Sequence, residues 1–136
     1  MKNENHLIDF FDSLKEWTGL KNPKASIIVK TPGNMIGWHV DTYFKFRSSC
    51  PDYDENEYLP IRFMYFPLKH QKGHAFGVET DWLTSWEVGT GITWHPNAGH
   101  CGANCGTTIT ATINVTGLIR KEEFENFNLT DIKNPW

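Results

Sequence analysis

The first part of the chain carries apolar side chains at helical spacing. Between residues 7 and 17, hydrophobic side chains recur every three or four positions, at Leu7, Phe10, Phe11, Leu14 and Trp17. Side chains at this spacing share one face of a helix, and Gly19 follows where the pattern ends, as glycine commonly does after a helix. The pattern therefore predicts an amphipathic helix within residues 1–20, with an apolar face that covers another element.

From residue 25 onward the helical spacing gives way to short runs of β-branched and aromatic residues. Turn-forming Gly, Pro and Asn residues separate these runs. The runs that we expect to be strands cover residues 25–30, 36–47, 61–66, 75–79, 83–88, 92–94 and 107–116. A series of about eight short strands after a single helix favours an all-β sandwich or barrel over alternating strands and helices.

The length of the chain limits it to one structural unit. A chain of 136 residues has room for one core of ordinary size and not for two. We therefore expect one domain over residues 1–136, in which residues 1–20 form the covering helix. Residues 119–136 are expected to form a C-terminal tail, with a short helix followed by a docked end.

The run over residues 36–47 places polar side chains on one face of an expected strand. Alternate residues of a strand point to opposite faces, so His39, Asp41 and Tyr43 share a face. The opposite face is apolar, and we expect the helix at residues 1–20 to cover it. An imidazole nitrogen and a carboxylate oxygen on one face are two suitable ligands for a divalent metal ion.

His100 is the candidate for a third ligand. It follows the turn-forming residues 96–99, and strands that are far apart in sequence can meet across the mouth of a β-barrel. Two histidines and one carboxylate form the triad that holds iron in non-haem Fe(II) enzymes. The alternative interpretation is that His39 and Asp41 form a surface pair on a strand with two different faces.

Charge and hydropathy narrow the classes of partner. The net charge of −3 gives no basic field, which disfavours nucleic-acid binding through phosphate contacts. The sequence has no charged-then-apolar leader, no apolar run of spanning length and no lipidation box, so we expect a cytoplasmic protein without membrane contact. The acid-rich residues 52–57 are expected to form a solvated loop, which would favour a basic substrate if it overhung the metal site.

The chain contains three cysteines, Cys50, Cys101 and Cys105. An odd number does not form a complete disulfide framework, and a reducing compartment is the simplest setting for it, so we expect free thiols. A zinc site that joins Cys101 and Cys105 to His95 and His100 is the alternative. The spacing of these residues is not that of paired zinc ligands, which argues against such a site.

Further short motifs follow the His39 strand in a fixed order. They are Ile61-Arg62-Phe63-Met64-Tyr65-Phe66, Gly73-His74, Trp86-Glu87-Val88-Gly89, Ile92-Thr93-Trp94, His100, Asn104, Gly106 and Val115-Thr116-Gly117. In this order the chain, over roughly residues 25–118, resembles the compact Fe(II)- and 2-oxoglutarate-dependent dioxygenases. It looks most like their small prolyl-hydroxylase-like and phage-type members.

The resemblance implies a fold, an activity and a set of ligands. The implied fold is the double-stranded β-helix, or jelly roll, which cupins share. The implied metal ligands are His39, Asp41 and His100, and the implied reaction couples decarboxylation of 2-oxoglutarate by O₂ to oxidation of a C–H bond. The substrate would be a small molecule or a peptide. A carboxylate at Asp41, where halogenases carry a smaller residue, favours a hydroxylase within this resemblance.

The chain departs from the family at the 2-oxoglutarate anchor. Many members carry an arginine on the strand after the distal histidine, whereas this chain has Thr108, Ile109 and Thr110 there. We therefore expect Arg62 to bind the distal carboxylate of 2-oxoglutarate, since a buried carboxylate needs a cation. Hydroxyl groups that could assist it belong to Tyr43, Tyr65, Thr108 and Thr110.

Two alternatives follow from this departure. Arg62 could instead point to solvent or pair with an acid such as Asp52 or Glu57. The domain could then be a non-catalytic, cupin-like module that binds a metal or a small molecule, or a jelly roll without a metal.

Overall fold

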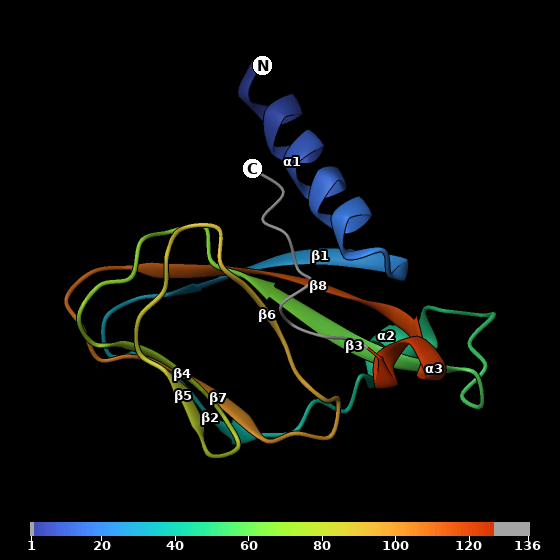
Figure 1. Ribbon diagram of the computed structural model, residues 1–136. Coiled ribbons are helices and arrows are strands. Elements are labelled where there is room, and N and C mark those ends of the chain that lie inside the picture. Colours follow the sequence, from blue (N-terminus) through green and yellow to red (C-terminus); the bar gives the residue numbers. More distant parts are fainter. Residues whose placement is uncertain (1, 127–136) are drawn as a thin grey trace.

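The computed structural model describes residues 2–126 and begins with one helix that leads into a β-rich body (Figure 1). Helix α1 covers Lys2–Thr18, as the helical spacing predicts. The strands that follow are β1 (Lys21–Lys30), β2 (Met35–His39), β3 (Tyr58–Tyr65), β4 (His74–Val78), β5 (Asp81–Leu83), β6 (Gly91–Thr93), β7 (His100–Asn104) and β8 (Thr110–Arg120). Two short helices complete the described part, α2 (Phe44–Ser48) and α3 (Lys121–Glu125).

The strands form two antiparallel sheets that face each other. The larger sheet has the order β1-β8-β3-β6 and the smaller sheet the order β2-β7-β4-β5. Most consecutive strands alternate between the sheets, so the chain crosses the core repeatedly, and β1 pairs with β8 from the other end of the sequence. The expectation of an all-β architecture after a single helix is confirmed in this form.

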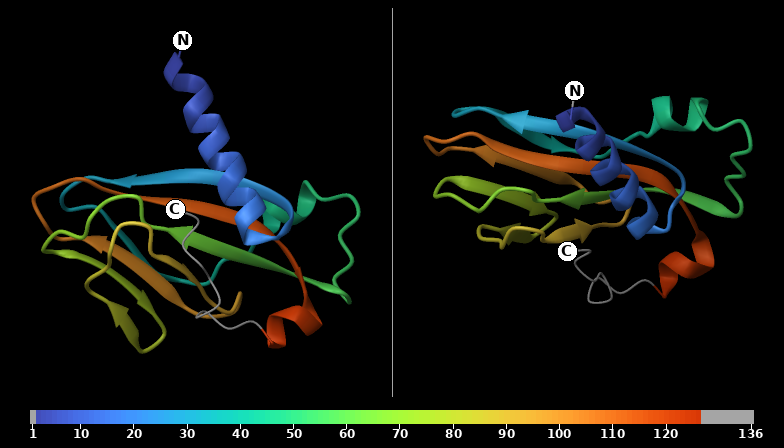
Figure 2. Two further views of the ribbon diagram at one scale, coloured as in Figure 1. Left: turned by 45° about the horizontal axis from the view of Figure 1, so that its top comes forward. Right: turned by 90° about the horizontal axis from the view of Figure 1, so that it is seen from above.

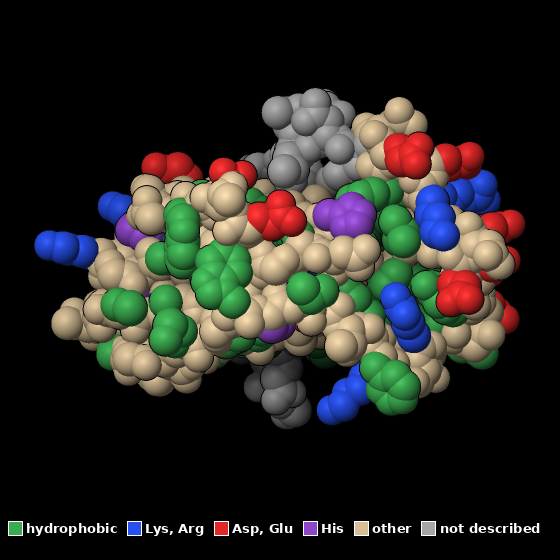
Figure 3. Space-filling view, turned by 90° about the horizontal axis from the view of Figure 1, so that it is seen from below, with side chains coloured by type: hydrophobic (Ala, Val, Ile, Leu, Met, Phe, Trp, Pro, Cys, Tyr) green, Lys and Arg blue, Asp and Glu red, His purple; other side chains and the backbone are tan. Residues whose placement is uncertain are grey.

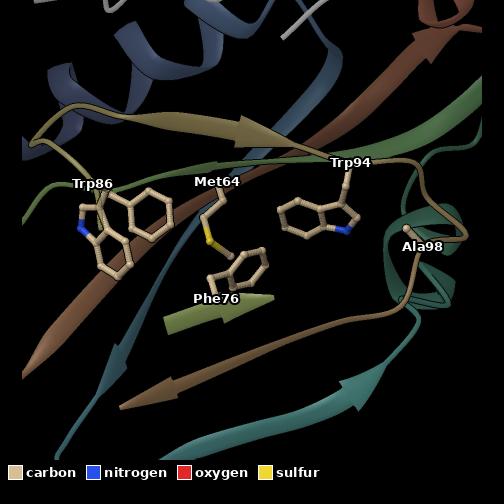
Figure 4. Close-up of a cluster of buried hydrophobic side chains, with 6 residues drawn as sticks. Met64, Phe76, Trp86, Trp94 and Ala98 are labelled. Atoms are coloured by element: carbon tan, nitrogen blue, oxygen red, sulfur yellow. The ribbon is translucent and has the colours of Figure 1, made fainter. Parts of the chain in front are cut away.

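The core between the sheets is aromatic. Met64, Phe76, Trp86, Trp94 and Ala98 are buried together there, and Figure 4 shows them between strands of both sheets. The outer face of the smaller sheet is different, because Met35, Trp38 and Trp82 are exposed on that sheet. Hydrophobic side chains accordingly gather on this side of the molecule (Figure 3).

Helix α1 covers the outer face of the larger sheet. Leu14 is fully buried there against Phe63 and Tyr65 of β3 and Ile113 and Val115 of β8. Figure 2 shows α1 crossing over this sheet, with its N-terminal half rising away from it. The expectation that α1 covers the strand at residues 36–46 is therefore wrong. Alternate positions of β3 and β8 bear large apolar side chains on their outer face, and this face offers the helix more area to bury.

The predicted strand over residues 36–47 ends early. Strand β2 stops at His39, and α2 begins at Phe44. Tyr43 has a φ of 53°, a left-handed conformation that breaks an extended chain. The helical turn then buries Phe46 against Cys50 and Leu118, which the alternating pattern of a strand would not achieve.

Other boundaries differ by smaller amounts. The strand expected at residues 83–88 is wrong except at Leu83, where β5 ends, and residues 84–88 form no strand. Strand β8 extends to Arg120, past the expected end of the last strand. The short helix expected in the tail is α3, whereas the docked end expected after it falls on residues 127–136, outside the described residues.

The described residues also bear on two expectations about location. Cys50, Cys101 and Cys105 are all free, and only Cys105 is exposed. None of the helices within residues 2–126 has both the length and the apolar character needed to cross a membrane.

Candidate metal centre

The register of two neighbouring strands brings the histidines together. Strand β2 ends at His39, β7 begins at His100, and these two residues are direct partners in the antiparallel ladder. Their ring centroids are 4.2 Å apart. Asp41 follows two residues after the end of β2, and one ligand atom from each of the three residues lies within 4.8 Å of the others. The predicted convergence of His39, Asp41 and His100 is thus present in the structure.

Hydrogen bonds orient both imidazole rings. Nδ1 of His39 lies 2.8 Å from the carbonyl oxygen of Gly37, and Nδ1 of His100 lies 3.1 Å from that of Ala98. A carbonyl oxygen only accepts, so each Nδ1 carries the hydrogen and each neutral ring keeps the lone pair of Nε2 free. These Nε2 atoms face the carboxylate of Asp41, at 3.8 Å for His39 and 3.4 Å for His100.

This arrangement gathers electron pairs around one point. Two Nε2 lone pairs and a carboxylate repel one another unless a cation lies between them, and either a proton or a metal ion supplies it. The backbone carbonyls fix the rings from behind, which is how metal-binding histidines are commonly held. The three residues can therefore hold a divalent metal ion.

The carboxylate of Asp41 is kept in its ionised form. Burial acts to raise the pKa of Asp41, but His100, Arg62 and His39 act in the opposite direction and hold it below its usual value. Side-chain exposure falls from 38% for His39 to 13% for Asp41 and 4% for His100. The centre is thus open to solvent on the side of His39 and closed on the side of β7.

Arg62 contacts this centre directly. Its Nη1 lies 2.9 Å from Oδ2 of Asp41, its Nε lies 3.5 Å from the hydroxyl of Thr116, and its guanidinium lies 5.8 Å from the ring of Tyr43. Oδ2 of Asp41 is buried and has no partner with hydrogen-bond geometry among residues 2–126, so its contact with Arg62 is chiefly one of charge. The partners considered from sequence, Asp52 and Glu57, are therefore not those of Arg62.

The structure separates the four hydroxyl-bearing candidates. Tyr43 is buried beside Asp41, and its hydroxyl has no hydrogen-bond partner in the described part of the chain. Tyr65 lies on the outer face of β3 under α1, because it shares the parity of Phe63 and not that of Arg62.

Thr108 and Thr110 lie at the start of β8 and in the loop before it, at the opposite end of the two sheets from the triad. Thr108 is an exposed loop residue whose carbonyl accepts hydrogen bonds from His74 and Asn104, and Asn104 stands at the opposite end of β7 from His100. Thr110 is buried and pairs with Lys30 across the sheet. Of these candidates the structure brings only Tyr43 against the triad.

A second cation near the centre was missed in the sequence. Lys30 is 5% exposed and lines a cavity of about 30 Å³ together with His39, Arg62, His100 and Asn114. Burial lowers its pKa from the usual value, and no ion pair to it occurs among residues 2–126. Both parities of residues 25–30 include aliphatic side chains, so the pattern gave no sign that Lys30 faces inward.

Buried polar atoms that lack partners among residues 2–126 lie at and near this cavity. Oδ1 of Asn114, which lines the cavity, is one of them, and Oγ1 of Thr112, on the same face of β8 but outside the lining, is another. Nε1 of Trp94, whose ring centroid is 4.8 Å from that of His100, is a third such atom. Buried polar groups without partners are uncommon and often mark a ligand site.

No protein-family model matches this sequence, and no curated protein is significantly similar to it.

Proposed function

We propose that this protein is an Fe(II)- and 2-oxoglutarate-dependent dioxygenase of the hydroxylase type. The observation that carries the proposal is the convergence of His39, Asp41 and His100, whose ligand atoms lie within 4.8 Å of one another. Two neutral imidazoles and an ionised carboxylate are the donor set of the facial triad in non-haem Fe(II) oxygenases.

The topology supports the same proposal. Within the described residues, eight antiparallel strands form two facing sheets in the orders β1-β8-β3-β6 and β2-β7-β4-β5, and this arrangement supports the proposal of a jelly roll, or double-stranded β-helix. In this arrangement β2 and β7 are neighbours although they are far apart in the sequence. The ligands lie where β2 ends and β7 begins, at the mouth between the sheets.

The chain's residues supply binding and orientation. When bound, Fe(II) with 2-oxoglutarate supplies the activation of O₂ that oxidises a C–H bond. Gly37 and Ala98 orient the two rings through their carbonyl oxygens, and Arg62 holds the carboxylate of Asp41 anionic. His39, Asp41 and His100 would hold the ion, and the positions that they do not occupy would be free to bind the 2-oxo acid and O₂.

The cavity is lined by two cationic side chains, Lys30 and Arg62, which are suitable partners for the carboxylates of a dicarboxylate. Lys30 has no carboxylate of its own within the described residues, whereas Arg62 is already paired with Asp41. We therefore assign the distal carboxylate of 2-oxoglutarate to Lys30, assisted by Thr112 or Asn114, and give Arg62 the role of orienting Asp41. This replaces the assignment of Arg62 that the sequence suggested.

The volume of the cavity adds a requirement. A space of about 30 Å³ corresponds to one water molecule and is smaller than a five-carbon dicarboxylate. Binding of 2-oxoglutarate therefore requires lining side chains to change rotamer. The long, flexible side chains of Lys30 and Met64 are the lining groups best able to do so.

An anaerobic titration tests the proposal. Fe(II) and then 2-oxoglutarate are added to the metal-free protein, and the visible charge-transfer absorbance of the chelated iron is followed. We expect the band in the parent and in His95→Ala, a control at an exposed histidine outside the triad. We expect Asp41→Ala and His100→Ala to lose at least about a hundredfold in Fe(II) affinity while remaining folded.

Release of CO₂ from 2-oxoglutarate in air is the second measurement. Iron-dependent release supports the dioxygenase. Iron binding without the absorbance band and without CO₂ would contradict it and support a cupin-like binding module. Fe(II) affinity that is the same in His100→Ala as in the parent would show that the triad is not the metal site.

A further inference from the structure

A wide groove opens beside the candidate metal centre. It has a volume of about 750 Å³ and is formed by the start of β1, residues 41–46, and Arg62 and Thr116 of β3 and β8. Asp41 and Arg62 belong both to this groove and to the centre. The groove therefore adjoins the metal centre through these two residues, and its volume lies within the range of small-molecule sites.

The groove carries an excess of positive charge. Among the described residues that line it, the cations are Lys24, Lys45 and Arg62, and Asp41 is the only acid. Arg62 and Asp41 neutralise each other at 2.9 Å. Lys24 and Lys45 take part in no ion pair within residues 2–126, so about two positive charges remain on a chain with a net charge of −3.

One of these lysines contacts neighbouring side chains. The Nζ atom of Lys24 donates a hydrogen bond to the hydroxyl of Ser49, and it lies 5.9 Å from the centroid of the Phe46 ring. The exposed ammonium group thus lies at the wall of the groove and retains donors for a further acceptor.

Aromatic side chains form the rest of the wall. Tyr43 and Phe46 are buried, whereas Phe44 is 74% exposed. An aromatic side chain exposed to this extent gains free energy when a ligand covers it. The lining thus combines apolar area with two cations that have no carboxylate partner.

The acidic loop does not contribute to this groove. Residues 51–57 are not part of its lining, and in Figure 1 the loop extends beyond α2, at the end of the molecule away from β4 and β5. The preference for a basic substrate that would follow from an overhanging acidic loop is therefore not supported. Because Lys24 and Lys45 line the groove, we expect a negatively charged substrate and not a basic one.

We propose that this groove binds the substrate to be oxidised, and that this substrate carries an anionic group beside an apolar or aromatic part. The anionic group, a carboxylate or a phosphate, pairs with Lys24 and Lys45, and the apolar part lies on Phe44 and Tyr43. The part of the inference that concerns oxidation rests on the proposed function. The preference for anions depends on the groove alone.

Matched small probes test this preference in the metal-free protein. Phenyl phosphate, phenylacetate, benzyl alcohol and benzylamine share one ring and differ in charge, and their binding is followed by backbone amide NMR shifts. We expect phenyl phosphate or phenylacetate to shift the amides of residues 24–26 and 42–46 and to bind at least about tenfold more tightly than benzyl alcohol. The stronger of the two anions identifies the anionic group, and benzylamine should not bind.

A double variant identifies the cations. Lys24→Met with Lys45→Met should weaken binding of the preferred anion at least about tenfold, whereas Lys69→Met with Lys72→Met, two exposed lysines outside the groove, should leave it unchanged. Equal binding of benzylamine and the anions, shifts centred elsewhere, or no effect of the Lys24 and Lys45 changes would overturn the inference. Because no metal is present, these outcomes are independent of the iron titration, and either proposal can fail alone.

Discussion

The buried amine of Lys30 is expected to reduce the stability of the metal-free protein. Lys30 is 5% exposed, burial lowers its pKa, and no carboxylate within residues 2–126 pairs with it. Taking an unpaired ammonium group out of water costs several kcal/mol, and part of this is recovered through the polar lining of the cavity. We expect Lys30→Met, which keeps the volume and removes the charge, to raise the free energy of unfolding by about 2 kcal/mol.

This free energy corresponds to a measurable change in melting temperature. For a chain of 136 residues, the usual unfolding entropy of about 2 cal/mol/K per residue converts 2 kcal/mol into a rise of about 7 °C in Tm. The assay is thermal unfolding followed by circular dichroism, with a chelator present to exclude metal. Lys69→Met, at an exposed position, is the matched control and should change Tm by less than about 2 °C.

The pH dependence gives the sharper test. The pKa of Lys30 is lower in the folded protein than in the unfolded chain, so the unfolded chain binds more protons between these two values. The parent therefore gains stability as the pH rises through this interval, and the advantage of Lys30→Met shrinks as the pH rises from neutral toward the ordinary pKa of lysine. A difference in Tm that stays constant over this range, or a Lys30→Met protein less stable than the parent at neutral pH, would refute the reasoning.

Three further outcomes are expected. Leu14→Ala, which removes a fully buried side chain under α1, should lower the free energy of unfolding by about 2 to 5 kcal/mol in chemical denaturation. A thiol reagent should modify Cys105 rapidly in the native protein, and Cys50 and Cys101 only after unfolding. A stoichiometric zinc content that disappears with Cys101→Ala would contradict this prediction. Gly73→Ala should also destabilise the protein, because Gly73 has a φ of 94° and a Cβ there would lie 2.5 Å from the backbone nitrogen of Gly106. A Tm equal to that of the parent would contradict this prediction.

The spacing of apolar residues along the chain predicted which segments form helices and strands better than it predicted which of these segments pack together. The spacing that ends at Trp17 is a local property, and α1 follows it closely. The face that α1 covers depends on how β3 and β8 pair, and this pairing joins residues such as Phe63 and Val115 that no local pattern connects. The helix was therefore correctly predicted and its position was wrong.

The candidate metal centre shows the same division. The pairing of His39 with Asp41 was expected from a strand that in fact ends at His39, and the two side chains still meet because Asp41 lies only two residues past that end. The left-handed conformation of Tyr43 has no clear sequence signature, since tyrosine seldom adopts it. Lys30 was missed because both faces of its strand include aliphatic side chains, and only the assembled sheets show which face is inside.

The pairing of His39 with His100 makes the centre a bridge between two strands. Strand β2 lies at the edge of the smaller sheet, where β7 alone pairs with it, and their ladder is irregular between Ile36 and His39. An ion held by both histidines would clamp the free end of this edge strand to its neighbour. Occupancy at a hundred times the dissociation constant would add about 2.7 kcal/mol to the folded state. Amide hydrogen exchange should then slow most along β2. Metal uptake would therefore be detectable as slower opening of this edge strand, without any catalytic turnover.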